Sequence, residues 1–164
     1  MRFKILSLAA ALALLAACET APETTANTGG AGAAGTGAAT TTTGIRPGSQ
    51  QDLDANVGSR VYFATDKSDI TPEARRTLER QAEWLKRYPN VTVTIEGHCD
   101  ERGTREYNLA LGERRASAVK NVLAALGIPA NRVSTISYGK ERPAVVGSNE
   151  QAWAQNRRGV TIVN

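Results

Sequence analysis

The spacing of hydrophobic positions in the second half of the chain predicts alternating strands and helices. Residues Val57 to Ala64 are rich in Val, Tyr and Phe, which is typical of a strand. Thr71-Pro72-Glu73 then has the features of a helix start: a hydroxyl that can cap, a proline at the first helical position and an acid in the first turn. Apolar residues recur at helical spacing at Ala74, Leu78, Ala82 and Leu85. This helix should end before Pro89-Asn90.

The remaining residues repeat the same alternation of strand and helix. Strict alternation of apolar and polar residues from Val91 to Glu96 predicts a strand with one buried face. A second long helix is expected from near Asn108 to Gly127. Further elements are predicted as a strand at Val133–Tyr138, a short helix at Glu150–Asn156 and a last strand at Gly159–Val163. The order β-α-β-α-β-α-β predicts one α/β sandwich domain over residues 52–164, with helices packed on one side of a sheet.

The first residues of the chain are typical of an export signal. Basic Arg2 and Lys4 precede an apolar run that is too short to span a membrane, and small residues precede Cys18. The stretch Leu15-Ala16-Ala17-Cys18 resembles a bacterial lipobox, in which the peptide is cut before the cysteine and the cysteine is acylated. We therefore expect residues 1–17 to be a signal peptide and Cys18 to carry the lipid. Several acyl chains would make the anchor effectively permanent, and Glu19 favours the outer membrane over the inner one.

The segment after the cysteine has no pattern that could form a core. Residues 18–51 consist mostly of Ala, Gly and Thr, which predicts a lipidated N-terminus followed by a disordered tether. A literal GxGxxG occurs at residues 30–35, but no strand precedes it and no helix follows it, so we do not predict a nucleotide site there.

The charge and the cysteine content limit the partners and the covalent links that we expect for this protein. Loss of Arg2 and Lys4 with the signal peptide lowers the formal charge from +4 to +2. The basic residues form no stripe with interleaved aromatics, so we expect no nucleic-acid partner. Acylation of Cys18 leaves Cys99 as a lone thiol, and no intramolecular disulfide is expected.

The stretch "EGHCDERGT", residues 96–104, concentrates the candidate chemistry. A metal site is not expected, because His98 is the only histidine and its neighbour Cys99 should point to the opposite strand face. A hydrolytic triad is not expected either, since the chain has no GxSxG elbow. A peptidoglycan hydrolase using paired carboxylates remains an alternative, with Glu96, Asp100 and Glu101 as candidates. Nearby Arg102, Arg105 and Arg114 argue against it, because they would hold acids ionised.

A binding function fits the same stretch better. Asp100 stands at the end of a predicted strand, and Arg115 follows fifteen residues later in the next helix. A carboxylate beside a guanidinium matches a ligand that carries both an ammonium and a carboxylate, that is, a free amino-acid end. A plain structural ion pair between the two residues is an equally good reading of the spacing. Arg102 and Arg105 are predicted to be solvated loop charges.

Several longer stretches carry a family resemblance. "VYFATDKSDITPEA", "VTIEGHCDERGTREYNLALGERRASAV", "SYGKERPAV" and "NRRGVTI" resemble the OmpA-like C-terminal domain family, and in particular its peptidoglycan-associated lipoproteins. The likeness covers residues 57 to 163 and implies helices on one side of a mixed sheet. It also implies non-covalent, non-enzymatic binding of the diaminopimelate in peptidoglycan stem peptides, with no cofactor and no metal.

The resemblance implies roles for individual residues. Asp100 and Arg115 would clamp the ammonium and the carboxylate of the ligand, with further contacts from Leu111 and Asp66. The remaining expected site residues are Asn108 and Arg158, which would brace the site, and Thr65, which stands where family members often have an aromatic residue. Cys99 replaces a small residue and should serve packing. The family relation further implies an outer-membrane protein whose domain faces the periplasm, with TolB and other Tol–Pal components as partners in envelope integrity and cell division.

Overall fold

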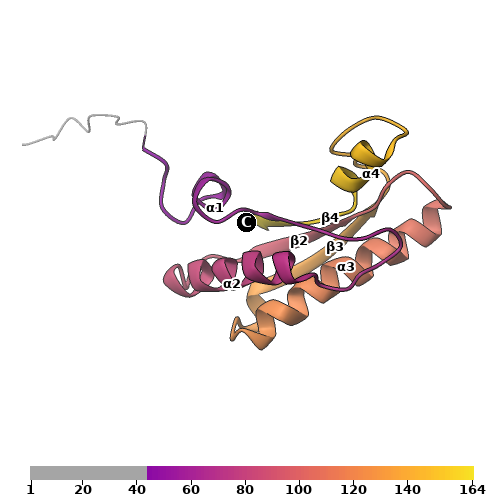
Figure 1. Cartoon of the computed structure of the whole chain (residues 1–164). Coiled ribbons are helices and arrows are strands. Elements are labelled where there is room, and N and C mark those ends of the chain that lie inside the picture. Colours follow the sequence, from indigo (N-terminus) through magenta and orange to yellow (C-terminus); the bar gives the residue numbers. More distant parts are fainter. Residues whose placement is uncertain (1–43) are drawn as a thin grey trace, which may run out of the picture. The chain divides into compact units, whose positions relative to one another are not determined.

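The computed structural model describes residues 44–164 (Figure 1). The predicted signal peptide, Cys18 and the predicted tether as far as residue 43 lie outside the described residues. Among residues 44–164, no helix combines the length and the apolar character that a membrane span requires.

The centre of the domain is a mixed four-stranded sheet in the order β1-β4-β2-β3. The strands are β1 Arg60–Tyr62, β2 Val93–His98, β3 Val133–Gly139 and β4 Arg158–Val163. β4 lies antiparallel to both β1 and β2, whereas β2 and β3 are parallel. The four predicted strands and the expected mixed sheet are confirmed, although the first strand covers only Arg60–Tyr62 of the predicted Val57–Ala64, because Val57 caps the end of α1.

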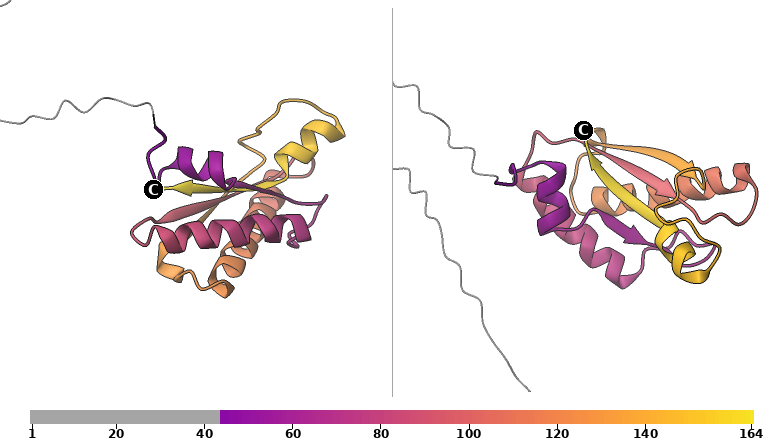
Figure 2. Two further views of the ribbon diagram at one scale, coloured as in Figure 1. Left: turned by 60° about the vertical axis from the view of Figure 1, so that its left-hand side comes forward. Right: turned by 90° about the horizontal axis from the view of Figure 1, so that it is seen from above.

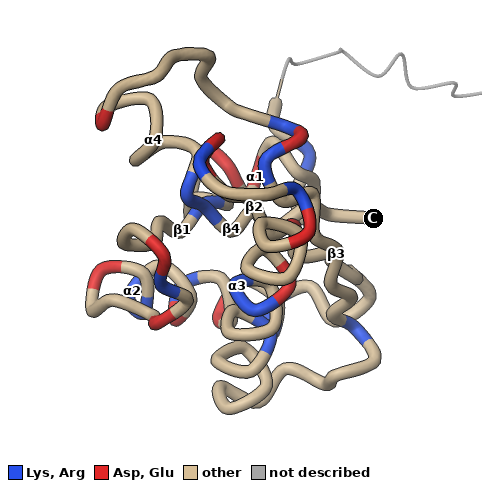
Figure 3. The backbone as a smooth tube through the Cα atoms, turned by 90° about the vertical axis from the view of Figure 1, so that its right-hand side faces the viewer, with Lys and Arg blue, Asp and Glu red and all other residues tan. Residues whose placement is uncertain are grey.

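Two long helices, α2 Pro72–Arg87 and α3 Arg105–Ala125, cover one face of the sheet (Figure 2). Thr71 caps α2 by accepting a hydrogen bond from the backbone N–H of Ala74, as its position before Pro72 predicts. Both helices pack their apolar sides on the strands. The fully buried core between them includes Leu78 and Leu85 of α2, Val119 and Leu123 of α3, and Ile95 of β2. Acidic and basic residues are interspersed along α2 and α3 (Figure 3).

Two short helices lie toward the other side of the sheet, at its opposite ends (Figures 1 and 2). Helix α4, Glu150–Asn156, has the predicted bounds and is capped by Asn149. Helix α1, Gln50–Asn56, was not predicted and crosses the expected domain start at residue 52. A 3-10 turn at Ala130–Arg132 precedes β3.

Helix α1 belongs to the folded domain because its side chains reach distant elements. Leu53 is fully buried in the core. The carboxylate of Asp52 accepts a hydrogen bond from the indole N–H of Trp84 in α2 at 3.0 Å. The side chain of Gln50 hydrogen-bonds to the part of β4 that the short strand β1 does not reach. It accepts from Val163 N at 2.8 Å and donates to Thr161 O at 3.3 Å.

We expect Leu53→Ala to lower the free energy of unfolding by about 2–5 kcal/mol, the usual cost of emptying a buried leucine site. Chemical denaturation of the two proteins measures the difference. Asp54→Ala is the matched control, because Asp54 is an exposed residue of the same helix and should change stability by less than about 0.5 kcal/mol. Equal stability of Leu53→Ala and the parent would show that α1 does not contribute to the fold.

Helix α3 crosses β2 at a pair of glycines. An added Cβ on Gly97 would lie 1.9 Å from the carbonyl oxygen of Gly112 and 2.5 Å from its carbonyl carbon. Since these are backbone atoms, no side-chain rotation could relieve the contact. The two glycines therefore bring the start of α3 close against the end of β2, beside the candidate site.

Candidate functional site

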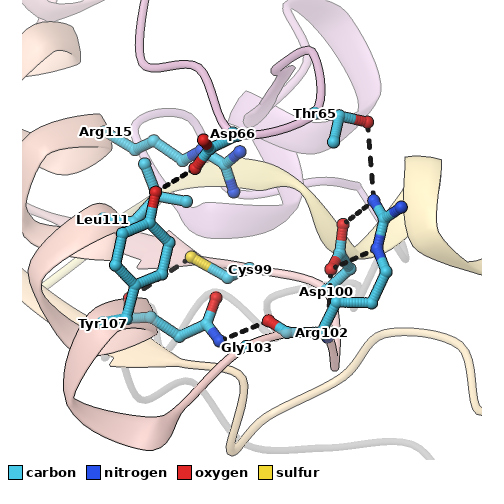
Figure 4. Close-up of a pocket in the computed structure, with 10 residues that line it drawn as sticks. Thr65, Asp66, Cys99, Asp100, Arg102, Gly103, Tyr107, Leu111 and Arg115 are labelled. Carbon is cyan, nitrogen blue, oxygen red and sulfur yellow. Dashed lines mark hydrogen bonds and ion pairs between the residues drawn. The ribbon is translucent and has the colours of Figure 1, made fainter.

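A pocket of about 300 Å³ lies between the end of β2, the start of α3 and the loop after β1 (Figure 4). Six of the predicted ligand residues line it: Thr65, Asp66, Asp100, Asn108, Leu111 and Arg115. Four further lining residues were not assigned from the sequence: Cys99, Arg102, Gly103 and Tyr107. Figure 4 shows Arg115 and Asp66 on one side of the pocket and Asp100 with Arg102 on the other.

The loop between β2 and α3 forms one wall and is firmly held. Gly103 has φ +85°, a conformation that favours glycine, and lets the chain turn into α3. Thr104 then caps the helix, accepting from Tyr107 N, so α3 begins at Arg105 and not near Asn108 as predicted. Asn108 donates its amide N–H groups to the carbonyl oxygens of Arg102 at 2.7 Å and Thr104 at 3.0 Å. From the other side, the ammonium of Lys140 donates to the loop carbonyls of Glu101 and Gly103.

Asp100 is a buried carboxylate surrounded by arginines. Arg102 donates to it through Nε at 3.1 Å and Nη2 at 2.7 Å, and Nη1 of Arg157 lies 3.5 Å away. Burial on its own raises the pKa of Asp100, but the hydrogen bonds from Arg102 and then Arg157 outweigh it and hold the pKa below its ordinary value. Asp100 is therefore an ionised acceptor at neutral pH. The prediction that Arg102 is a solvated loop charge is wrong.

Arg115 is fully buried and holds three backbone carbonyls. Its Nε, Nη1 and Nη2 donate to the carbonyl oxygens of Lys67 at 2.8 Å, His98 at 2.8 Å and Ala64 at 3.2 Å. Burial lowers its pKa, yet a guanidinium stays charged at neutral pH. Within residues 44–164 no carboxylate forms an ion pair with Arg115. Each of its three guanidinium nitrogens thus donates to a backbone carbonyl within residues 44–164, and the thiol of Cys99 is a further hydrogen-bonding neighbour.

Asp100 and Arg115 are therefore brought to the same pocket without bonding each other in the described part of the chain. The alternative of a plain ion pair between them is wrong. Instead, one side of the pocket has a buried cation that forms no ion pair within residues 44–164, and the other side has an ionised carboxylate.

Asp66 and its neighbours form the outer rim. Asp66 has φ +59° and accepts a hydrogen bond from the hydroxyl of Tyr107, which raises the pKa of that tyrosine. Thr65 Oγ1 lies 3.4 Å from Nη2 of Arg102, so it contacts the opposite side. Leu111, only 5% exposed, supplies an apolar wall.

Arg158 does not line the pocket, although it was predicted to brace it. Its guanidinium donates to the carbonyl oxygens of Asn156 and Arg142. The preceding residue, Arg157, reaches Asp100 instead. Adjacent residues at the start of a strand point to opposite faces, so only one of the two arginines can reach the site.

Cys99 and His98 are both buried, in different surroundings. Cys99 lies inside the pocket wall, where burial raises the pKa of its thiol and its Sγ is 3.3 Å from the carbonyl oxygen of Asn108. It is a free thiol that serves packing. His98 is absent from the pocket lining; its Nε2 lies 3.2 Å from Glu96, and burial lowers its pKa. No group of three or more potential metal ligands occurs within residues 44–164.

The carboxylates proposed for hydrolysis do not gather around the pocket. Glu96 pairs with His98 and Glu101 accepts from the indole N–H of Trp153, and neither lines the cavity. Hydrogen bonds from Ser148 and Trp153 lower the pKa of Glu101. The pKa of Asp100 is lowered as well, whereas a general acid needs a raised one.

Comparison with known proteins decides the family. Residues 62–157 match the family model described as the OmpA family. A peptidoglycan-associated lipoprotein of Agrobacterium fabrum is 51% identical over 97% of this chain and 86% of its own length. This chain belongs to the peptidoglycan-associated lipoproteins of the OmpA family.

Other family members extend the comparison. The peptidoglycan-associated lipoprotein of Haemophilus influenzae is 45% identical over 96% of this chain and 95% of its own length. The crystal structure of the one from Burkholderia pseudomallei is 40% identical, covers 65% of this chain and 90% of its own, and superposes with a TM-score of 0.63. The C-terminal domain of Helicobacter pylori MotB, at 22% identity, 64% and 83% coverage and a TM-score of 0.60, shares the fold.

Proposed function

We propose that this protein is an envelope lipoprotein that holds peptidoglycan non-covalently, with its pocket around the free end of the diaminopimelate residue in a stem peptide. The supporting observation is Arg115, a buried guanidinium that lines the pocket and forms no ion pair with a carboxylate of the described residues. A buried charge is stabilised by a partner of opposite sign. An anionic group on the ligand would supply that partner.

The two sides of the pocket suit the two charges of an amino-acid end. The ligand carboxylate would accept from the guanidinium of Arg115, in the planar geometry that this group offers. The ligand ammonium would reach Asp100 across the pocket, with Asp66 adding negative charge at the rim. Leu111 and Cys99 would contact the methylene chain between them. Nothing in this arrangement needs a bond to break, which fits a binding role and not an enzymatic one.

The proposal extends to the location of the protein. The relatives are named as lipoproteins, which supports acylation of Cys18. Glu19 favours the outer membrane, so the domain would face the periplasm and connect that membrane to the wall. A tether from Cys18 to the start of α1 at Gln50 would span about 30 Å on average as a Gly-rich coil. Membership of the same group also supports TolB and other Tol–Pal components as partners.

The test is binding of the mature protein to isolated peptidoglycan sacculi. We expect co-sedimentation that a soluble stem peptide ending in diaminopimelate competes away, and no release of soluble fragments from the sacculi. The same peptide with the side-chain carboxylate of its diaminopimelate amidated is the matched control and should not compete. Absence of co-sedimentation would contradict binding, and sustained release of fragments would favour the hydrolase.

A further inference from the structure

Arg102 covers the carboxylate that the ligand ammonium is proposed to reach. Two of its donors, Nε and Nη2, approach the two oxygens of Asp100 separately, at 3.1 and 2.7 Å (Figure 4). This is the parallel two-pronged contact in which guanidinium and carboxylate bind most strongly. The Arg102 side chain is 40% exposed and that of Asp100 only 9%, so Arg102 lies on the solvent side of the pair.

The remaining contacts of Arg102 allow its side chain to leave without unfolding the loop. Its guanidinium carbon lies 4.2 Å from the centre of the Trp153 ring and its Nη2 lies 3.4 Å from Thr65 Oγ1, two contacts that the side chain would give up when it leaves. The loop itself is held through backbone atoms, since Arg102 N donates to Asp100 and Arg102 O accepts from Asn108. Asp100 would keep Arg157, which is 7% exposed, as a second partner behind it.

We propose that Arg102 is a built-in competitor for the ammonium subsite: its guanidinium occupies Asp100 in the free protein, and a ligand binds by displacing it. This inference rests on the proposed function and adds Arg102 as a residue that sets the affinity of the pocket for its ligand. Replacing the guanidinium of Arg102 by the ligand ammonium at Asp100 contributes little binding free energy by itself, because one ion pair replaces another. A ligand that bears only an ammonium is therefore held weakly, and one that also brings a carboxylate to Arg115 gains a second ion pair in the same event.

Substitution of Arg102 tests the competition. Calorimetric titration compares the parent, Arg102→Lys and Arg102→Met, each with a stem peptide ending in diaminopimelate and with its lysine analogue, which keeps the side-chain ammonium but lacks the side-chain carboxylate. We expect Arg102→Met to bind both peptides about three- to tenfold more tightly, the size expected for release of a partly exposed ion pair. Arg102→Lys should lie between, because an ammonium makes a one-pronged contact.

A second outcome separates the competitor from a ligand-binding residue. If Arg102 bound the ligand carboxylate, Arg102→Met would lower the affinity for the diaminopimelate peptide and leave the affinity for the lysine analogue unchanged. That result would overturn the inference. Unchanged affinity for both peptides would overturn it too. Arg105→Met is the matched control, since Arg105 is 68% exposed, pairs with Glu141 at 3.4 Å and does not line the pocket. Its affinities should equal those of the parent.

Tryptophan emission reports the displacement directly. Ligand should change the emission of the parent as the guanidinium leaves Trp153, and this change should be lost in Arg102→Met and in Trp153→Phe. The indole N–H of the other tryptophan, Trp84, donates to Asp52 of α1, so the emission of Trp84 should not change when ligand binds. A change that persists in Arg102→Met would contradict the displacement. Failure of the parent to bind either peptide would instead contradict the proposed function itself.

Discussion

Asparagine in place of Asp100 should weaken binding of a stem peptide that ends in diaminopimelate by about 30-fold to several thousand-fold. Loss of one partner of a desolvated charge pair costs about 2–5 kcal/mol, which corresponds to that range of affinity. The amide keeps the shape of the side chain and removes its charge, so the ligand ammonium would face Arg102 and Arg157 without compensation. Calorimetric titration measures the loss.

Two controls keep this result interpretable. Glu101→Gln removes the neighbouring carboxylate, which does not line the pocket, and should bind nearly like the parent. A thermal melt shows whether Asp100→Asn is folded at the titration temperature. Parental affinity in a folded Asp100→Asn protein would show that Asp100 is not the ammonium partner.

The carboxylate side of the pocket is better probed through the ligand than through the protein. Removing the Arg115 side chain would strand the carbonyl oxygens of Ala64, Lys67 and His98, so loss of binding could follow from loss of structure. Amidating the ligand carboxylate leaves the protein intact and removes the same charge pair. We expect a loss of affinity as large as that of Asp100→Asn.

Alanine at Gly97 should destabilise the domain by at least about 3 kcal/mol, or prevent folding. The new methyl group would overlap the backbone of Gly112, 1.9 Å from its carbonyl oxygen, and α3 would have to move away from β2. Chemical denaturation measures the effect. Because Asp100 and Arg115 lie on the two elements that would separate, ligand binding should be lost as well.

Gly159→Ala is the matched control for this change. Gly159 lies opposite Gly97 in the sheet, but its added methyl group would meet side-chain methyls of Val119 and Val61 at 3.3 Å, which can give way. We expect a clearly smaller loss of stability. Equal effects of the two substitutions would show that the close crossing of α3 over β2 is not what the fold requires at Gly97.

Local sequence signals predicted most elements of the fold. The cap and proline at Thr71-Pro72 gave the start of α2, and the bounds of α4 were predicted as observed. Helix α1 was missed because its seven residues show no period, and its contacts are made with Trp84 and Val163, far away in the chain. The first turn of α3 was missed because its apolar residues begin only at Leu109, after the cap Thr104.

The candidate site was predictable in its residues and less so in their contacts. The spacing of Asp100 and Arg115 suggested that the two could meet, the family resemblance implied their roles, and the structure places both in one pocket. That Arg102 turns back onto Asp100 depends on the loop conformation, which the sequence does not specify. The exchange of roles between Arg157 and Arg158 depends on which face of β4 each residue takes, and that requires the register of the sheet.

The position of α1 has a mechanical consequence for a protein that joins a membrane to a wall. The chain enters the domain at α1, beside the last residues of β4, whereas the pocket lies at the other end of the strands, near the start of β4. Tension between the two attachments would pass from α1 into β1, the next element of the chain, and load the hydrogen bonds between β1 and β4 together, in shear. The contacts of α1 through Gln50, Asp52 and Leu53 lie outside this ladder. Under pull they would yield first, lengthening the connection while the sheet keeps its grip on the ligand.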